Sequence, residues 1–289
     1  MTRMVVFTDL DGSLLDAATY SFEAAREALA ALRDRNVPLV LASSKTKAEM
    51  DVIRSRLGHT HPFVVENGGG VFIPAGLFHV PIPNATPRRG CQVVELGTAY
   101  AGLRRRLKEI AQVLGFEVRG FGDMSVAEVA ERAGLDLSEA AAAKQREYDE
   151  PFVFDGPAER IEEFRRQAET RGLRCVKGGR FHHLMGRNDK GSACRLLIDC
   201  YRRQFKDDQG SLITVAIGDS LNDLPMLAVV DRPVLVQKPD GSYEPDIRLP
   251  NLTLAPGIGP VGWNAAVLQL INRLNGGQEI VRGPRQPGP

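Results

Sequence analysis

The chain has 289 residues, of which 43% are hydrophobic and 25% are charged, the composition of an ordinary globular protein. At about 150 residues per domain this length allows two domains. The 37 Lys and Arg residues nearly balance the 36 Asp and Glu residues, and a formal charge of +1 excludes a strongly basic nucleic-acid binder. No uncharged apolar run reaches the roughly 18 residues of a membrane span. We therefore expect a cytoplasmic protein with neither a nucleic-acid nor a membrane partner, and the sequence leaves its oligomeric state open.

The first part of the chain predicts alternating strands and helices. Three short apolar runs are expected to form buried parallel strands, at residues 4–8, 37–42 and 63–66. An amphipathic helix is expected after Ser21, and a second helix begins with the capping box of Thr46 and Glu49. Strand and helix alternation at this spacing predicts right-handed βαβ units in a parallel sheet.

This alternation stops after Ile73, where a stretch rich in Pro and Gly indicates a crossing between domains. The residues that follow predict strands and helices in another order, α+β in character. The βα pattern resumes near Asp189 and continues to a final helix at 262–274. We therefore expect an α/β fold with a Rossmann-like parallel-sheet core at residues 1–84 and 187–289, interrupted by an inserted α+β domain at 85–186.

Polar residues follow several predicted strands, where ligands collect in an open parallel sheet. These residues are Asp9 and Asp11 in DLDGS, Ser43, Ser44 and Lys45 after the second strand, Lys190 in NDKG, and Asp219, Asn222 and Asp223 in GDSLNDLPM. Carboxylates gathered at one sheet edge repel each other unless a cation compensates their charge. Mg²⁺ fits best, because it prefers hard oxygen ligands and the chain lacks a His and Cys array at zinc spacing. A divalent ion beside a lysine indicates phosphoryl transfer.

In this order the four segments resemble the four motifs of the haloacid dehalogenase superfamily of phosphohydrolases. The long insert between the second and third motifs resembles the C2B-type cap of its Cof-like sugar phosphatases. Five further segments are similar to mannosyl-3-phosphoglycerate phosphatases: FTDLDGSLLD, ASSKT, REYDEPF, GGRFHHLMG and GPVGW. The resemblance covers nearly the whole chain, about residues 3 to 275.

The resemblance implies a role for each catalytic residue. Asp9 is the expected nucleophile, which forms an aspartyl phosphate. Asp11 is the expected general acid and base for the leaving oxygen and for the hydrolytic water. Ser43 is expected to bind a phosphoryl oxygen, and Lys190 to screen the charge of the phosphate and of Asp9.

It also implies the binding residues. The expected Mg²⁺ ligands are Asp9, the backbone carbonyl of Asp11, Asp219, and Asp223 either nearby or through water. The cap is expected to recognise an anionic sugar through a short segment rich in donors, in which His182 is preferred over its neighbour His183. The expected substrate-binding residues are Ser44, Lys45, Asn67, Arg180, His182 and Asn222.

The implied reaction is Mg²⁺-dependent hydrolysis of mannosyl-3-phosphoglycerate to mannosylglycerate and phosphate. Other substrates of the same group stay open: glucosyl-3-phosphoglycerate, a sucrose-type phosphate or a hexose phosphate. A phosphomutase would yield isomerised product without free phosphate. A catalytically silent binding protein is a further alternative, against which the intact pair of Asp9 and Asp11 argues.

Overall fold

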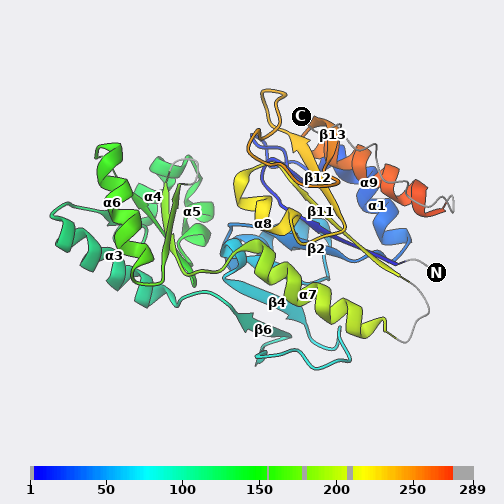
Figure 1. The fold of residues 1–289 in the computed structure, drawn as a ribbon, viewed down its shortest axis with the longest axis horizontal. Coiled ribbons are helices and arrows are strands. Elements are labelled where there is room, and N and C mark those ends of the chain that lie inside the picture. The colour runs from blue at the N-terminus through cyan, green and yellow to red at the C-terminus, as the bar shows by residue number, and fades with distance from the viewer. Residues whose placement is uncertain (1–2, 155, 178–180, 207–210, 276–289) are drawn as a thin grey trace, which may run out of the picture.

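The computed structural model describes residues 3–154, 156–177, 181–206 and 211–275. Two lobes lie side by side in Figure 1, a core built from both ends of the described chain and a cap built from its middle. The chain passes from the core into the cap before α3 (Tyr100–Leu114) and returns before α7 (Lys190–Gln204).

The core is built on a nine-stranded sheet with the order β13-β12-β11-β1-β2-β3-β4-β6-β5. Its strands are β1 (Arg3–Thr8), β2 (Leu39–Ala42), β3 (Phe63–Val65), β4 (Gly70–Pro74), β5 (Thr86–Arg88), β6 (Cys91–Glu95), β11 (Leu212–Gly218), β12 (Arg232–Gln237) and β13 (Thr253–Ile258). The strands from β13 to β3 pair in parallel, and β4, β6 and β5 extend the sheet in antiparallel fashion. Because β1 lies between β11 and β2, the residues that follow these three strands meet at one edge of the sheet.

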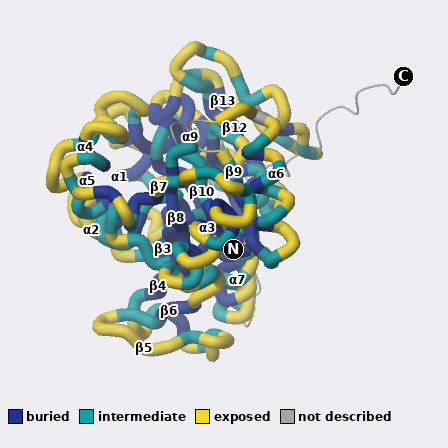
Figure 2. The backbone as a smooth tube through the Cα atoms, turned by 90° about the vertical axis from the view of Figure 1, so that its left-hand side faces the viewer, coloured by how far each residue is buried: buried dark blue, intermediate teal, exposed yellow. Residues whose placement is uncertain are grey.

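Helices cover both faces of this sheet. Helices α1 (Arg26–Asp34), α2 (Lys47–Leu57) and α9 (Pro260–Asn275) lie on one face, and α7 and α8 (Leu224–Leu227) lie on the other. Met50 and Trp263 on the first face and Leu197 on the second are fully buried, and each such side chain contributes about 1.5–3 kcal/mol. Figure 2 shows strand β5, at one border of this sheet, as exposed. The predicted capping box of α2 is confirmed, with Thr46 as the N-cap.

The cap contains a four-stranded antiparallel sheet with the order β7-β8-β10-β9. Its elements are α3, β7 (Arg119–Gly120), α4 (Val126–Ala133), α5 (Leu137–Ala143), β8 (Asp149–Val153), α6 (Ala158–Glu169), β9 (Arg174–Lys177) and β10 (His182–Met185). Leu107 of α3 and Phe164 of α6 pack with Phe152 on one face of this sheet. Helices α4 and α5 pack against each other and do not join this cluster. Helix α5 also contacts α2 of the core.

The predicted boundary at residue 84 needs correction. The stretch taken as the start of the inserted domain forms β5 and β6, which pair with each other and with β4 in the core sheet. Pro87 lies in β5, an exposed edge strand, and an edge strand tolerates a residue that lacks a backbone N–H. Residues 86–95 therefore belong to the core sheet, and the first element of the cap is α3.

The fold class is as predicted, an α/β Rossmann-like core with an inserted α+β cap. Within the described ranges, no helix has the length and apolar character that crossing a membrane requires.

Candidate active site

The predicted acids lie at the edge where the carboxyl ends of β1 and β11 meet. Thr8 of β1 pairs with Ile217 of β11, and the backbone N–H of Asp9 continues the ladder by donating to the Ile217 carbonyl at 2.9 Å. Asp9 and Asp219 therefore follow the ends of two neighbouring strands, one and two residues after the paired Thr8 and Ile217. The parallel pairing of two buried strands is the reason that residues 210 positions apart in the chain share one site.

Lys190 is the centre of a buried ion-pair network. Its side chain is fully buried at the start of α7, and its Nζ lies 2.5 Å from Asp9 Oδ1 and 2.7 Å from Asp223 Oδ1. Burial raises the pKa of Asp9 well above its ordinary value, and Lys190 opposes this shift. The two carboxylates in turn raise the pKa of Lys190. A buried ammonium without such partners would be strongly destabilising, so the network holds Lys190 charged beside the expected nucleophile.

Three carboxylates could hold a metal ion here. Asp9, Asp219 and Asp223 each offer an oxygen, and these atoms lie within 4.8 Å of one another. Burial, with the nearby Asp223 charge, raises the pKa of Asp219 to about 6. Three acids against one lysine leave an excess of negative charge that a divalent cation would compensate, and the all-oxygen donor set suits Mg²⁺.

The three acids are not equivalent. Both oxygens of Asp223 already accept bonds, Oδ1 from Lys190 and Oδ2 from the backbone N–H groups of Asp219 at 3.1 Å and Ser220 at 3.2 Å. Asp219 accepts one bond, from the Ser13 hydroxyl at 3.1 Å. The free oxygens at this edge thus come mainly from Asp9 and Asp219, whereas Asp223 positions Lys190 and the loop that carries Asp219.

Gly12 makes room for the Asp219 carboxylate. Its φ is +82°, and a Cβ at this position would lie 3.0 Å from Asp219 Oδ2. Glycine is therefore favoured twice, by the left-handed backbone and by the close approach of the carboxylate.

Asp11 lies away from this network and pairs with Lys45. Lys45 Nζ is 3.0 Å from Asp11 Oδ2, and the Asp11 side chain is 36% exposed. The other oxygen, Asp11 Oδ1, is buried without a hydrogen-bond partner among the described residues. A carboxylate with one anchored and one unpartnered oxygen is suited to exchange a proton with a bound substrate.

The predicted polar residues of the core gather around the same edge. The Ser43 hydroxyl oxygen accepts from the Lys45 backbone N–H at 3.1 Å, so its proton is free to donate. Asn67 donates its backbone N–H to the Ser43 carbonyl at 3.0 Å, and its Oδ1 lies 3.5 Å from Asn222 Nδ2. The backbone carbonyl of Ser44 accepts a hydrogen bond from Arg146 Nη1 of the cap at 3.0 Å. The structure thus brings Asn67 and Asn222 together from two short 3-10 helices, Glu66–Gly68 after β3 and Leu221–Asp223 after β11.

The predicted cap residues are placed differently. Arg180 lies outside the described residues. The His182 ring packs beside Phe152 and Phe154, with centroids 5.7 Å and 6.1 Å away, on the cap face that α3 and α6 cover. His182 therefore does not join the core residues, because strand alternation turns it toward the interior of the cap.

The neighbouring His183 points to the opposite face of the cap sheet. Its Nδ1 lies 2.7 Å from Asp149 Oδ2, and Asp149 also lies 3.5 Å from Arg146 Nη1. Sequence reasoning did not select His183 as a site residue. The alternation of β10 indicated that the two histidines face opposite ways, but only the pairing with β8 decides which one faces away from the cap interior.

Residues 146–148 join the cap to the core, a role that sequence reasoning missed. The buried Glu66 carboxylate accepts the backbone N–H groups of Glu147 at 2.9 Å and Tyr148 at 2.8 Å. Burial raises the pKa of Glu66 to about 7, although these two bonds and Arg146 lower it. The Tyr148 ring packs within the core cluster, and its hydroxyl donates to Glu95 at 2.9 Å. The REYDEPF segment therefore fixes the cap over the sheet edge.

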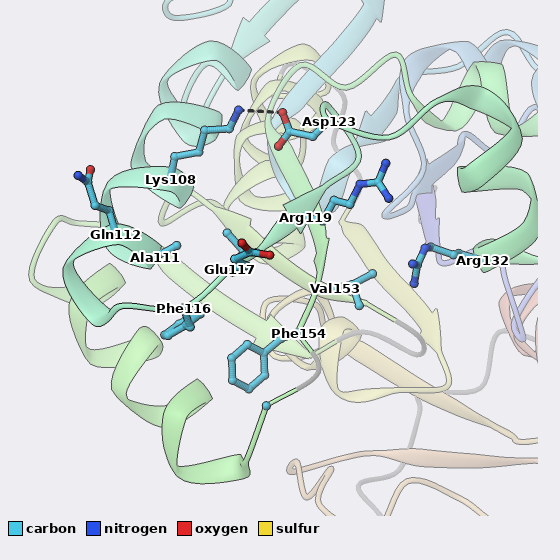
Figure 3. Close-up of a pocket in the computed structure, with 12 residues that line it drawn as sticks. Lys108, Ala111, Gln112, Phe116, Glu117, Arg119, Asp123, Arg132, Val153 and Phe154 are labelled. Carbon is cyan, nitrogen blue, oxygen red and sulfur yellow. Dashed lines mark hydrogen bonds and ion pairs between the residues drawn. The ribbon is translucent and has the colours of Figure 1, made fainter.

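A cavity of about 780 Å³ on the cap contains none of the predicted residues. Lys108 and Asp123 pair at 2.8 Å. Figure 3 shows this pair at one side of the cavity, with Phe116 and Phe154 at another. Asp123 also pairs with Arg104 at 2.7 Å. Because the Asp123 charge is balanced within the cap, this cavity resembles a surface hollow rather than the reaction site.

Known proteins share this sequence and this fold. A family profile of haloacid dehalogenase-like hydrolases matches residues 6–79. A glucosyl-3-phosphoglycerate/mannosyl-3-phosphoglycerate phosphatase of Methanococcoides burtonii is 45% identical over 273 residues, 94% of this chain and 99% of that protein. A mannosyl-3-phosphoglycerate phosphatase of Pyrococcus horikoshii is 31% identical over 80% of this chain and 90% of that protein. A solved HAD subclass IIB sugar phosphatase, 13% identical, superposes with a TM-score of 0.61 over 94% of this chain and 98% of its own.

The near full-length match to the first relative, together with the four motifs at one sheet edge, assigns the family. The chain belongs to the haloacid dehalogenase-like hydrolases, as a phosphatase with an inserted cap.

Proposed function

We propose that this phosphatase hydrolyses mannosyl-3-phosphoglycerate to mannosylglycerate and phosphate, with Mg²⁺ as its cofactor. The observation that carries the proposal is the buried network of Lys190 with Asp9 and Asp223, next to the partly free Asp219 carboxylate. Such a site suits a phosphoryl group, and the names of the relatives at 45% and 31% identity supply the rest of the substrate.

In the first step Asp9 attacks phosphorus in line, a P–O bond forms to its carboxylate, and the ester P–O bond breaks. Asp11 donates a proton to the leaving glycerate oxygen, for which its unpartnered Oδ1 is suited. In the second step Asp11 takes a proton from water, whose oxygen attacks the phosphorus of the aspartyl phosphate. The bond to Asp9 breaks, and phosphate leaves with the Asp9 carboxylate restored.

The surrounding residues hold the phosphoryl group for both steps. Lys190 stays charged against Asp9 and Asp223 and neutralises the phosphoryl oxygens, while the free proton of Ser43 donates to one of them. Magnesium would be held by Asp9, Asp219 and the Asp11 backbone carbonyl, with Asp223 nearby, and would lower the charge on the transferred group. Lys45, Ser44, Asn67 and Asn222 lie around this position and are proposed to contact the substrate.

A second candidate substrate is glucosyl-3-phosphoglycerate. The relative that is 45% identical carries both sugars in its name, whereas the relative at 31% identity carries mannose alone. The two sugars differ at one hydroxyl group, so one contact can decide between them.

The test is phosphate release from a panel of monoesters, compared by kcat/KM with Mg²⁺ and with a chelator. The panel contains both glycosyl-3-phosphoglycerates, a sucrose-type phosphate, glucose 6-phosphate and 4-nitrophenyl phosphate. We expect mannosyl-3-phosphoglycerate to rank first and the chelator to abolish its hydrolysis. If it ranks with the generic hexose phosphate, or if turnover survives without metal, the proposal is wrong.

A further inference from the structure

A cleft of about 310 Å³ lies between the core and the cap, where Lys45 forms part of its lining. Its core wall carries Tyr20, Lys45, Glu49 and Val52, and its cap wall carries Ser138 and Ala142. We call it the α2–α5 cleft, after the helices that form its two sides. Its volume is at the lower end of the roughly 300–1,000 Å³ of small-molecule sites.

A partly buried hydrogen bond joins the two walls. The Thr46 hydroxyl donates to the Ala142 carbonyl at 2.9 Å, and Thr46 is fully buried. Thr46 is the N-cap of α2, and Ala142 lies in the last turn of α5. This bond therefore sets the spacing of the walls, and the cleft exists only while the cap is seated on the core.

The cleft adjoins the position of the leaving group. Lys45 lines it, and Lys45 Nζ also lies 3.0 Å from Asp11 Oδ2. In a glycosyl-3-phosphoglycerate the leaving oxygen is on the carbon next to the one that carries the sugar. When that oxygen is at Asp11, the sugar is only a few bonds away, and the cleft is lined by the lysine that pairs with Asp11.

The lining matches the two kinds of surface that a sugar ring presents. Val52 is 59% exposed although it is apolar, and the Tyr20 ring has Lys45 Nζ 4.8 Å from its centroid. Both can pack against the C–H face of a pyranose. Glu49 Oε2 accepts from the Thr46 backbone N–H at 2.8 Å, while its Oε1 is 3.9 Å from Lys45 Nζ and can still accept from a hydroxyl group.

We infer that the α2–α5 cleft binds the sugar ring of the substrate, with Glu49 accepting a hydrogen bond from a sugar hydroxyl. This inference rests on the proposed function, because it takes Asp11 as the acid for the glycerate oxygen. It places sugar selection on α2 and α5, whereas the sequence suggested the cap segment that contains Arg180 and His182. The core and the cap then each supply half of the specificity site.

The test measures one ratio, kcat/KM for mannosyl-3-phosphoglycerate over kcat/KM for 4-nitrophenyl phosphate, which has no sugar. Ser138 is exposed in the first turn of α5, so Ser138→Trp fills the cleft at a position where a large side chain is tolerated. We expect the ratio to fall by about 30-fold or more. Glu131→Trp, exposed on α4 and not part of the cleft lining, is the matched control and leaves the ratio within about twofold.

A milder variant guards against misfolding. Glu49→Gln keeps the length of the side chain and an oxygen for the α2 capping box, and we expect it to lower the ratio about 10-fold. Unchanged ratios in both variants, with wild-type circular dichroism spectra, overturn the cleft assignment while the proposed function stands. If the wild type hydrolyses 4-nitrophenyl phosphate but neither glycosyl-3-phosphoglycerate, the proposed function fails. The ratio is then taken with the best sugar phosphate of the panel, and an unchanged ratio there overturns the cleft assignment as well.

Discussion

The two ends of the site differ in how their charges are held. The floor consists of Asp9, Lys190, Asp219 and Asp223, and the mouth consists of Asp11, Lys45 and the α2–α5 cleft. In the floor, the side chains of Lys190 and Asp223 are fully buried and that of Asp9 is 7% exposed, whereas in the mouth Lys45 is 14% and Asp11 36% exposed. A buried network cannot rearrange without a large energetic cost, but an ion pair open to water can exchange partners. On the proposed function, the fixed floor suits the phosphoryl group, which every substrate shares, and the more exposed mouth suits leaving groups that differ.

The largest effect is expected from removing the proposed nucleophile in the floor, Asp9. Asp9→Asn keeps the shape of the side chain but removes its charge, so phosphate release should fall by about 10⁴-fold or more. Phosphate is measured with mannosyl-3-phosphoglycerate and with 4-nitrophenyl phosphate. Asp34→Asn, on the exposed side of α1, serves as the control. If Asp9→Asn keeps more than a few per cent of wild-type turnover, the nucleophile is another group.

The two lysines should differ in how much they contribute to stability. Lys190→Met leaves Asp9 and Asp223 without their cation, and we expect it to lower the free energy of unfolding by about 3 kcal/mol in the absence of metal. Lys45→Met removes a partly exposed pair and should change that free energy by less than about 1 kcal/mol. Urea unfolding with EDTA measures both values. Equal losses in the two variants would contradict the division into floor and mouth.

The contact between Glu66 and the backbone of Glu147 and Tyr148, which we call the joint, holds the cap on the core. The stability of the protein should depend on pH through Glu66, because its pKa is raised to about 7. In the folded protein Glu66 keeps its proton at pH values where the unfolded chain has lost it. Its contribution to stability is therefore present below about pH 4.5 and is lost as pH rises toward 7, by about 2–3 kcal/mol at most.

Urea unfolding of the metal-free protein at pH 5 and pH 7 measures this dependence, with Glu66→Gln as the comparison. Other acids titrate in the same range, so the informative quantity is the difference between the slopes of the two proteins. We expect the free energy of unfolding to decrease less between pH 5 and pH 7 in Glu66→Gln than in the wild type. Parallel slopes would show that the Glu66 carboxyl does not titrate in this window.

A smaller loss of stability than that of Lys190→Met is expected at Gly12, which lies beside Asp219. Gly12→Ala places a Cβ 3.0 Å from Asp219 Oδ2 at a positive φ, which costs about 1–2 kcal/mol of stability. The displaced carboxylate should also weaken Mg²⁺ binding, measured by calorimetry. Gly76→Ala, at a positive φ with open space around it, is the matched control. Equal Mg²⁺ affinity in the two variants would mean that Asp219 does not depend on Gly12.

The floor could be predicted from the sequence because each of its parts directly follows a strand or begins a helix. Asp9 follows an apolar run, and Lys190 begins a helix after a capping Asp. Parallel strands then bring these positions together whatever the rest of the fold does. The local sequence around each floor residue is therefore enough to predict where that residue lies in the fold.

In the mouth, Asp11 and Lys45 were among the predicted residues. The α2–α5 cleft and the contacts that join the cap to the core could not be predicted in this way, because they depend on how the cap lies on the core. Glu66 meets residues 147 and 148, and Thr46 meets Ala142, only in the folded arrangement of two lobes. The choice of His182 over His183 needed the pairing of β10 with β8. The boundary at residue 84 failed because turn-forming residues also suit an edge hairpin, here β5 and β6.

The most direct test of a common floor is to trap the phosphorylated enzyme during turnover. Mannosyl-3-phosphoglycerate and 4-nitrophenyl phosphate are each mixed with the protein and Mg²⁺, quenched in acid, reduced with borohydride and analysed by peptide mass spectrometry. The account predicts that both substrates modify one residue, Asp9, and that Asp9→Asn abolishes the modification. A modification at another residue, or at different residues for the two substrates, would contradict it.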